Sequence, residues 1–233
     1  MTHIVNEIKK HPSQGKIISR IDRPSKEMVE KFKNFYTGIV LDAMGKNGCM
    51  HTDLGPIKSG MKVCGPAITC LGADLSVRRM AIDLANVGDV LVVAAGGATD
   101  FACFGDGTAK RMKIKGMAGA VIDGAIRDSA GIKDLDFPTF AKGVTPKNHH
   151  YPLASEYGAV NVPVVCGGIL VNPGDLIIGD DDGVIVVPKD IIHKIENEIS
   201  LAFTEEQHLR GKWTQYEPFN VLKELISKGY EVE

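Results

Sequence analysis

The chain has 233 residues, of which 44% are hydrophobic and 24% are charged, and its formal net charge is -2. This size and composition predict a soluble globular protein of one large domain or two small ones, with a sizeable core. The near-neutral charge excludes the chain-wide basic field that binds nucleic acid or anionic membranes. No apolar run approaches the ~20 residues that a membrane-spanning helix needs.

The cysteines indicate a reducing compartment. Their number is odd, none forms a Cys-x-x-Cys pair, and the polar stretch 1–16 has no secretory signal pattern. We therefore expect a cytoplasmic protein whose thiols are small core residues. They are Cys49, Cys64, Cys70, Cys103 and Cys166.

The chain begins with a segment that has no clear amphipathic period, residues 1–24, which we interpret as an arm on the surface or on a neighbouring subunit. A helix is expected to start after the N-cap Ser25, and a second one over residues 37–44. No repeat, low-complexity tract or linker interrupts the rest. Residues 25–233 are therefore predicted to form one domain that includes C-terminal helices.

The next segments alternate between strand and helix patterns. Residues 63–71 predict a strand that is broken at Gly65-Pro66, and residues 75–85 predict an amphipathic helix. The apolar run 90–95 predicts another strand, which ends at the glycine pair Gly96-Gly97. Such alternation is typical of an α/β fold with a parallel sheet.

The stretch 96–128 organises the chain. A second glycine turn at 104–107 is followed by a helix over 108–115 and an apolar strand over 118–123, which leads to Arg127-Asp128. This unit brings a backbone-rich turn and a charged turn to the C-terminal ends of neighbouring strands. Open α/β sheets bind their ligands at that edge.

The remaining segments are β-rich at first and then helical. We expect a short helix at 129–133, strands at 140–144, 160–166, 170–171, 176–178 and 184–187, and helices at 190–210 and 218–227. Gly211 is the expected stop of the long helix. The turn Asp180-Asp181-Asp182-Gly183 is interpreted as a hairpin, because it lacks the ligand spacing and distal glutamate of a calcium-binding loop.

Arg127 and Asp128 are the expected chemical centre. An arginine fork can bind a carboxylate or polarise a carbonyl, and an aspartate is a hard oxygen ligand suited to Mg²⁺ or Mn²⁺. By spacing alone, a solvated turn is the commoner reading of such a pair. Its place after an apolar strand and a glycine favours a site.

The turn Gly105-Asp106-Gly107-Thr108 is a second candidate. Glycines at a helix N-terminus leave N–H groups free to hold an anion, although a plain helix start with Asp106 as N-cap fits equally well. No Gly-Lys-Ser/Thr follows, so this is not a phosphate-binding P-loop. The pair His149-His150 has no third ligand spaced to complete a metal site.

Several short sequence motifs occur in a specific order. Twenty residues separate Asp106 from Arg127, and Asp128 follows directly. The other motifs are Gly65-Pro-Ala-Ile-Thr-Cys70, Asp123-Gly-Ala-Ile-Arg-Asp128, Val160-Asn-Val-Pro-Val-Val-Cys166, Val171-Asn-Pro-Gly-Asp175 and Asp180-Asp-Asp-Gly-Val-Ile-Val-Val-Pro188. Together they resemble the 4-hydroxy-4-methyl-2-oxoglutarate / 4-carboxy-4-hydroxy-2-oxoadipate aldolases, which share a fold with the regulator of ribonuclease activity A. The resemblance covers about residues 25–230.

The resemblance implies a class II, metal-dependent pyruvate aldolase. Its fold would be a single swivelling-type β/β/α domain with flanking N- and C-terminal helices, assembled as a homotrimer or homohexamer with sites at subunit interfaces. It would cleave a 4-hydroxy-2-oxo acid to pyruvate and a second oxo acid. Because both reactions pass through the pyruvate enolate, it would also decarboxylate oxaloacetate.

The resemblance also implies roles for particular residues. The N–H groups of Gly105, Asp106, Gly107 and Thr108 would hold the pyruvate carboxylate. Arg127 would bind the pyruvyl oxygens and act in catalysis, and Asp128 would hold Mg²⁺ or Mn²⁺.

The proton acceptor is a separate hypothesis. It would be a metal-associated water oriented by Asp106 or by a glutamate from the neighbouring subunit's C-terminal helix. Glu205 is the candidate for that catalytic glutamate, with Glu206 as the alternative.

The chain departs from the family pattern at two places. Gly131 stands where an acidic residue usually follows the metal aspartate, and the segment 147–151 is unusual. A second function class is a non-catalytic binder on the same fold that inhibits a ribonuclease or another protein. The retention of Asp106, Arg127 and Asp128 together favours the enzyme. A methyltransferase is set aside because no glycine-rich cofactor loop follows the first strand.

Overall fold

The computed structural model describes residues 13, 15–72, 74–148, 158–216 and 218–231, and within them a mixed eight-stranded sheet forms the centre of the fold. Its strands lie in the order β1 (Gly55–Pro56), β5 (Thr139–Val144), β4 (Gly119–Ile126), β3 (Val90–Phe104), β2 (Val63–Leu71), β9 (Leu176–Asp180) and β10 (Gly183–Val187), with β6 (Ala159–Val160) paired to β2. A second, two-stranded sheet consists of β7 (Val164–Cys166) and β8 (Ile169–Val171).

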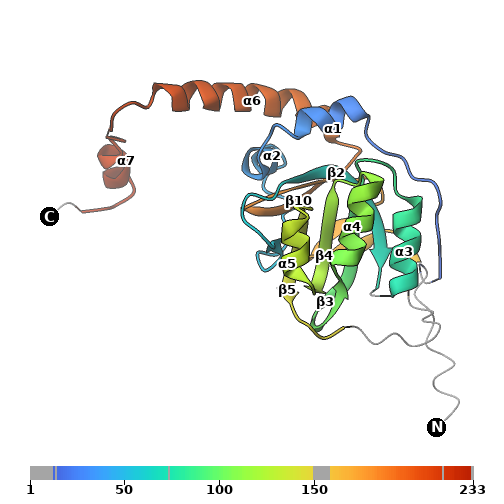
Figure 1. Cartoon of the computed structure of the whole chain (residues 1–233). Coiled ribbons are helices and arrows are strands. Elements are labelled where there is room, and N and C mark those ends of the chain that lie inside the picture. Colours follow the sequence, from blue (N-terminus) through green and yellow to red (C-terminus); the bar gives the residue numbers. More distant parts are fainter. Residues whose placement is uncertain (1–12, 14, 73, 149–157, 217, 232–233) are drawn as a thin grey trace, which may run out of the picture.

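The parallel strands β2, β3, β4 and β5 are joined by helices that lie on one face of the sheet (Figure 1). These helices are α3 (Leu75–Leu84), α4 (Asp106–Lys115) and α5 (Ser129–Asp134). Neighbouring parallel strands need such crossover connections, because a tight turn can join only antiparallel strands. The sheet β7–β8 contacts the other face, which confirms the α/β class and the β/β/α layering.

Alternating side chains build a separate core on each face of the sheet. On β4, Ile122 packs among α3, α4 and α5, whereas its neighbour Val121 packs towards β7 and β8, and neither is exposed. Successive residues of a strand point to opposite faces, so a strand buried on both sides is largely apolar. This accounts for the continuous burial of β4.

A third core lies under the terminal helices α1 (Lys26–Phe32), α2 (Thr37–Ala43) and α6 (Ile192–Lys212). The Ser25 hydroxyl accepts a hydrogen bond from the Met28 N–H, as predicted for an N-cap. The start of α6 packs on β9 and β10, and its later part runs away from the body towards α7 (Leu222–Ser227) (Figure 1). No helix among the described residues combines the length and apolar character needed to cross a bilayer.

Three predicted breaks were wrong, and each rested on glycine. Strand β3 continues past Gly96 and Gly97, whose φ angles of 71° and 74° bend the strand without ending it. Strand β2 is continuous through Gly65-Pro66, where it changes partner from β9 to β3. Helix α6 includes Gly211 in its last turn and ends one residue later, at Lys212, since a glycine in a helix costs only about 1 kcal/mol relative to alanine.

The described part of the N-terminal arm runs along the chain's own surface. The Ile18 N–H donates to the Val160 carbonyl at 3.1 Å. Farther along, Arg23 forms an ion pair at 2.7 Å with Asp89, whose side chain is 1% exposed. The pair His149-His150 lies outside the described residues.

The acidic turn joins β9 and β10 as a hairpin, which confirms the prediction. Its first carboxylate, Asp180, is buried and accepts hydrogen bonds from the Thr37 N–H (2.9 Å), the Thr37 hydroxyl (2.8 Å) and the Asp182 N–H (3.0 Å). It therefore ties the first turn of α2 to the hairpin, and that helix has no side-chain cap of its own.

We predict that Asp180→Ala lowers the free energy of unfolding by about 2 to 3 kcal/mol, because buried donors lose a charged acceptor. Chemical denaturation measures this change. The exposed neighbour Asp182 serves as the control, and Asp182→Ala should stay within about 0.5 kcal/mol of the wild type. Equal effects of the two substitutions would contradict the assigned role.

Candidate active site

The two turns singled out in the sequence meet at the C-terminal ends of β3 and β4. The Arg127 N–H donates to the Phe104 carbonyl at 2.8 Å, which joins the ends of the two strands. Gly105 follows directly and lies under both charged side chains. A Cβ at Gly105 would stand 2.8 Å from Asp128 Oδ2 and 3.2 Å from Arg127 Cγ. Any larger residue would push these side chains from their present positions.

Asp128 has a backbone conformation that non-glycine residues seldom adopt, with φ 57° and ψ 36°. Aspartate tolerates this left-handed region better than most residues, and such conformations are concentrated at functional sites. Asp128 precedes α5 but makes no capping bond to it. Its carboxylate instead lies 3.2 Å from Arg127 Nε, and both side chains are about two-fifths exposed. The carboxylate therefore keeps oxygen lone pairs available to a ligand.

The first turn of α4 offers backbone donors beside this pair. The Thr108 N–H already donates to the Gly105 carbonyl at 3.1 Å. Within the described residues, the N–H groups of Asp106 and Gly107 have no such partner, so they are available to an anion at the helix N-terminus. The Asp106 carboxylate stands in the same turn and is solvent-exposed.

Gly131, the predicted departure, lies directly against Asp106. A Cβ at this position would be 2.7 Å from Asp106 Oδ2 and 3.0 Å from Asp106 Cβ. The absence of a side chain at Gly131 therefore makes room for the Asp106 carboxylate. An acidic residue there would place a second negative group in the same space.

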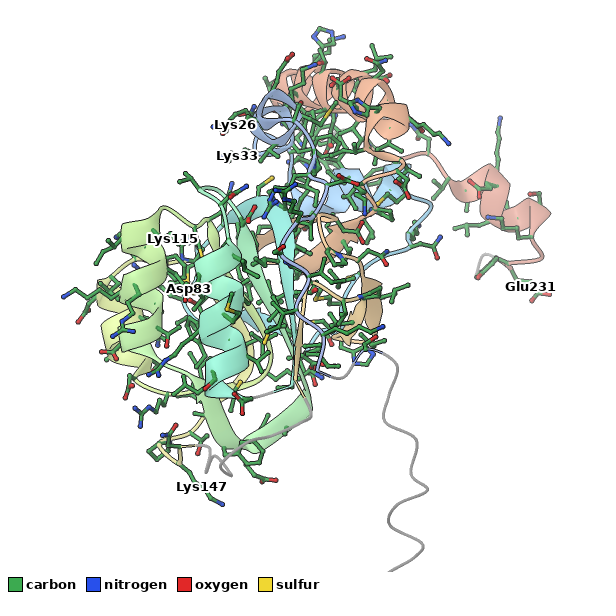
Figure 2. The ribbon with its side chains drawn as sticks, turned by 90° about the vertical axis from the view of Figure 1, so that its right-hand side faces the viewer. Lys26, Lys33, Asp83, Lys115, Lys147 and Glu231 are labelled. Atoms are coloured by element: carbon green, nitrogen blue, oxygen red, sulfur yellow. The ribbon has the colours of Figure 1, made fainter. Side chains whose placement is uncertain are left out.

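The glycine turn 105–108 and the pair Arg127-Asp128 line one cavity of about 510 Å³ between α3, α4 and the strand ends. Its lining contains five basic residues against three acidic ones. The basic residues are Arg78, Arg79, Arg111, Lys115 and Arg127, and the acidic ones are Asp83, Asp106 and Asp128. At one end α3 and α4 lie side by side, and Lys115 Nζ donates to the Asp83 carbonyl at 2.9 Å (Figure 2). The excess of positive charge suits an anionic ligand.

Sequence reasoning missed the basic wall of this cavity. The buried residues of α3 include Arg78, at 2% exposure, although an arginine was not expected on a buried face. Arg78 and Arg79 on α3 face the same cavity as Arg111 on α4. The available signal was the Arg-Arg pair on one helix and Lys110-Arg111 on the next, on the two helices that flank β3.

No group of three or more histidine, cysteine, aspartate or glutamate side chains is arranged around a common point in the part of the chain that the structure describes. A fully protein-caged ion is therefore not built from these residues. The Asp128 carboxylate is an open, hard oxygen donor. Such a site suits Mg²⁺, which is often bound by one or two carboxylates together with water and substrate oxygens.

Comparison with known protein families assigns this chain to one of them. The family model described as RraA-like, Aldolase/RraA, matches residues 37–186. The chain belongs to the RraA-like family. A relative from Halalkalibacterium halodurans, named "Putative 4-hydroxy-4-methyl-2-oxoglutarate aldolase", is 37% identical over 166 residues, which cover 70% of this chain and 77% of the relative.

Solved structures of RraA-like proteins share the fold. Streptomyces coelicolor RraAS2, described as an unusual member of the RNase ES inhibitor RraA family, is 31% identical with a TM-score of 0.71. The match covers 84% of this chain and all of RraAS2. A Geobacillus kaustophilus protein described as S-adenosylmethionine:2-dimethylmenaquinone methyltransferase is 29% identical with a TM-score of 0.60, over 68% and 98% of the two chains.

The two glutamates considered for this RraA-like chain both lie on α6 and neither lines the cavity. Glu206 is engaged within its own chain, where it accepts from the Tyr36 hydroxyl and pairs with Arg210. Glu205 is exposed. If a partner subunit supplies a carboxylate, Glu205 is the freer of the two.

Cys103 lines the cavity of this RraA-like protein but is not poised as a nucleophile. Burial raises the pKa of the Cys103 thiol, although the charge of Arg78 opposes the shift. Burial likewise raises the pKa of Cys64 and of Cys70 to about 12, and that of Cys166 is also raised. These thiols are protonated at neutral pH, where the thiolate would be needed for attack.

We predict that the native protein at pH 8 exposes one fast-reacting thiol per chain to Ellman's reagent, that of Cys49. The other four should react only slowly, because their raised pKa values and burial suppress both thiolate formation and access. Full reaction of all five in guanidinium chloride is the control. A Cys103 that is modified as fast as Cys49 would show that the cavity wall opens in solution.

Proposed function

We propose that the protein is a divalent-metal-dependent pyruvate aldolase, a carbon–carbon lyase that cleaves a 4-hydroxy-2-oxo acid to pyruvate and a second oxo acid. The observation that supports this most is the adjacency of Arg127 and Asp128 beside Gly105, at the edge of a predominantly basic cavity. The 4-hydroxy-4-methyl-2-oxoglutarate aldolase name of the H. halodurans relative agrees with it.

Asp128 is the residue that would hold Mg²⁺ or Mn²⁺. Its carboxylate faces the cavity, makes no helix-capping bond and has only hard oxygen chemistry to offer, which fits these ions. When bound, such an ion supplies Lewis-acid stabilisation to the oxygens of a 2-oxo acid. No Schiff base is needed, so the scheme requires no lysine.

Arg127 and the start of α4 would orient the pyruvyl half of the substrate. The N–H groups of Asp106 and Gly107 point from a helix N-terminus, which favours a carboxylate. The Arg127 guanidinium can donate to the 2-oxo oxygen, where negative charge grows as the enolate forms. The N–H donors are fixed by the backbone of α4, and the Arg127 side chain is held beside them by its ion pair with Asp128.

Cleavage also requires removal of the proton on the C4 hydroxyl. Asp106 stands beside the N–H donors and can accept this proton directly or through a water that it orients. Glu205 of the partner subunit is the second candidate, in a homotrimer or homohexamer with shared sites. Oxaloacetate decarboxylation would use the same Arg127 contact, because it forms the same enolate.

A second candidate function is inhibition of a ribonuclease by binding alone. The structural likeness to RraAS2, from a family of ribonuclease inhibitors, is the observation that favours it. A protein that acts by binding alone would not catalyse a reaction that a chelator can inhibit. A single assay of catalysis therefore distinguishes the two candidate functions.

The deciding experiment measures pyruvate release from a panel of 4-hydroxy-2-oxo acids and from oxaloacetate. We expect release with Mg²⁺ or Mn²⁺, loss of release in excess chelator, and recovery when the ion is restored. Spontaneous oxaloacetate decay without protein is the blank. Undiminished release in excess chelator would refute the metal-dependent mechanism, and no release from any substrate would favour the binding protein.

We predict that Arg127→Ala lowers kcat for both reactions by ~10² to 10³, or about 3 to 4 kcal/mol, because one preorganised contact to the enolate oxygen is lost. Arg127→Lys keeps the charge without the planar fork and should recover only part of the rate. Arg20→Ala, on the exposed arm, is the matched control and should behave as wild type. A folded Arg127→Ala protein with unchanged kcat and KM would place the active site elsewhere.

A further inference from the structure

The pairing of β3 with β4 changes register in the middle of the sheet. Val93 pairs with Ile122 and Phe104 pairs with Ile126, so β3 advances eleven residues while β4 advances four. If the first register continued, Arg127 would stand opposite Ala98. Gly105 would then lie seven residues farther along, at roughly 3.3 Å per residue. The candidate site exists because β3 takes up these extra residues at three successive register shifts between Val93 and Phe104, a segment that we call the bulge.

The neighbouring ladder is interrupted at the same level. Between the pairs Ile122–Ala141 and Ala125–Gly143, two residues of β4 stand opposite one residue of β5. That single residue is Lys142, and the first of the two on β4 is Asp123. The first register shift of β3, between the pairs Val93–Ile122 and Ala98–Gly124, therefore lies at the same level of β4 as this interruption.

A buried ion pair fills this point. Lys142 Nζ lies 3.0 Å from Asp123 Oδ1, and the two side chains are 12% and 8% exposed. Asp53, which is mostly exposed, approaches the same Nζ at 3.5 Å. Burial alone would lower the pKa of Lys142, but the ion pair with Asp123, together with the charge of Asp53, raises it above its usual value. The lysine is therefore a cation at neutral pH.

One of the two adjacent glycines of β3 lies close to this ion pair. A Cβ at Gly97 would come within 3.3 Å of Lys142 Nζ and 3.8 Å of Asp123 Oδ1, whereas a Cβ at Gly96 would meet nothing within 4 Å. Both glycines have nearly the same positive φ. The two positions therefore carry similar backbone constraints, but only a side chain at position 97 would contact the ion pair.

We propose that the buried Lys142–Asp123 ion pair positions the candidate active site, by holding the bulge that brings the Gly105 turn to Arg127 and Asp128. Neither residue lines the cavity, so both act through the backbone of β3 and β4. Each residue stands at a ladder interruption, where a side-chain contact replaces regular strand pairing. A neutral pair of similar size could preserve packing there, but it would lose the charge attraction that links β4 to β5 across the gap.

Amide hydrogen exchange tests this positioning without reference to activity. In Lys142→Met/Asp123→Leu, exchange at the Arg127 and Thr145 amides should accelerate at least tenfold, because their bonds to Phe104 and Ile126 lie just beyond the bulge. Amides in the regular part of β3, residues 90–93, should stay protected. Equal acceleration at all these sites, or no change at Arg127, would overturn the proposal.

A second ion pair, between the N-terminal arm and the residue that precedes β3, provides the control. Arg23 and Asp89 lie before the start of β3, on the far side from the bulge. Arg23→Met/Asp89→Leu should reduce overall stability without a selective change at Arg127. If it produced the same local acceleration, the effect would be one of general loosening, and the positioning role would be refuted.

A second comparison holds even if the Lys142 variant fails to fold. Gly97→Ala intrudes on the ion pair and should accelerate Arg127 exchange, whereas Gly96→Ala imposes similar backbone strain without touching it. Identical exchange in these two variants would contradict the proposal.

Kinetics add a readout that depends on the proposed function. In folded Lys142→Met/Asp123→Leu, kcat should fall at least tenfold because the turns are displaced, and Lys142→Arg should recover part of it. Unchanged kcat would overturn the positioning role. If the wild type releases no pyruvate, the proposed function fails, and the exchange data still decide this inference.

Discussion

The candidate site depends on the register between two parallel strands. Parallel strands normally keep a constant offset, and a constant offset would separate the helix that follows β3 from the end of β4. The change in offset lets the N-terminus of α4 and the turn after β4 share one space, joined by the bond from Arg127 to Phe104. Basic side chains from α3 and α4 then enclose that space, so its charge follows from the same arrangement.

Much of the fold follows from local interactions that can be predicted directly from the sequence. Ser25 caps a helix because its hydroxyl accepts a first-turn N–H, that of Met28, which has no acceptor within the helix. The Asp180 turn forms a hairpin between β-branched runs. The pairing of a glycine turn with a charged turn was also predictable, because both follow apolar strands in a β-α-β order. Gly105, Arg127 and Asp128 do lie together in the structure.

Other features depend on contacts between distant residues, which spacing cannot reveal. The glycines at positions 96 and 97 resemble a chain reversal, but in the fold they bend a strand whose neighbours continue to pair with it. Lys142 and Asp123 are individually ordinary polar residues, and only the register of β4 and β5 places them together. The burial of Arg78 likewise depends on how α3 packs beside α4, and an amphipathic pattern does not assign an arginine to the inner face.

The contact between Gly131 and Asp106 makes two positions on different helices interdependent. Asp106 can point as it does only while position 131 lacks a side chain, so the conformation of one residue depends on the size of the other. Any side chain at position 131 would require the exposed Asp106 side chain to turn away from its present place at the start of α4. The orientation of one candidate site residue is thus set from a helix that lines no part of the cavity itself.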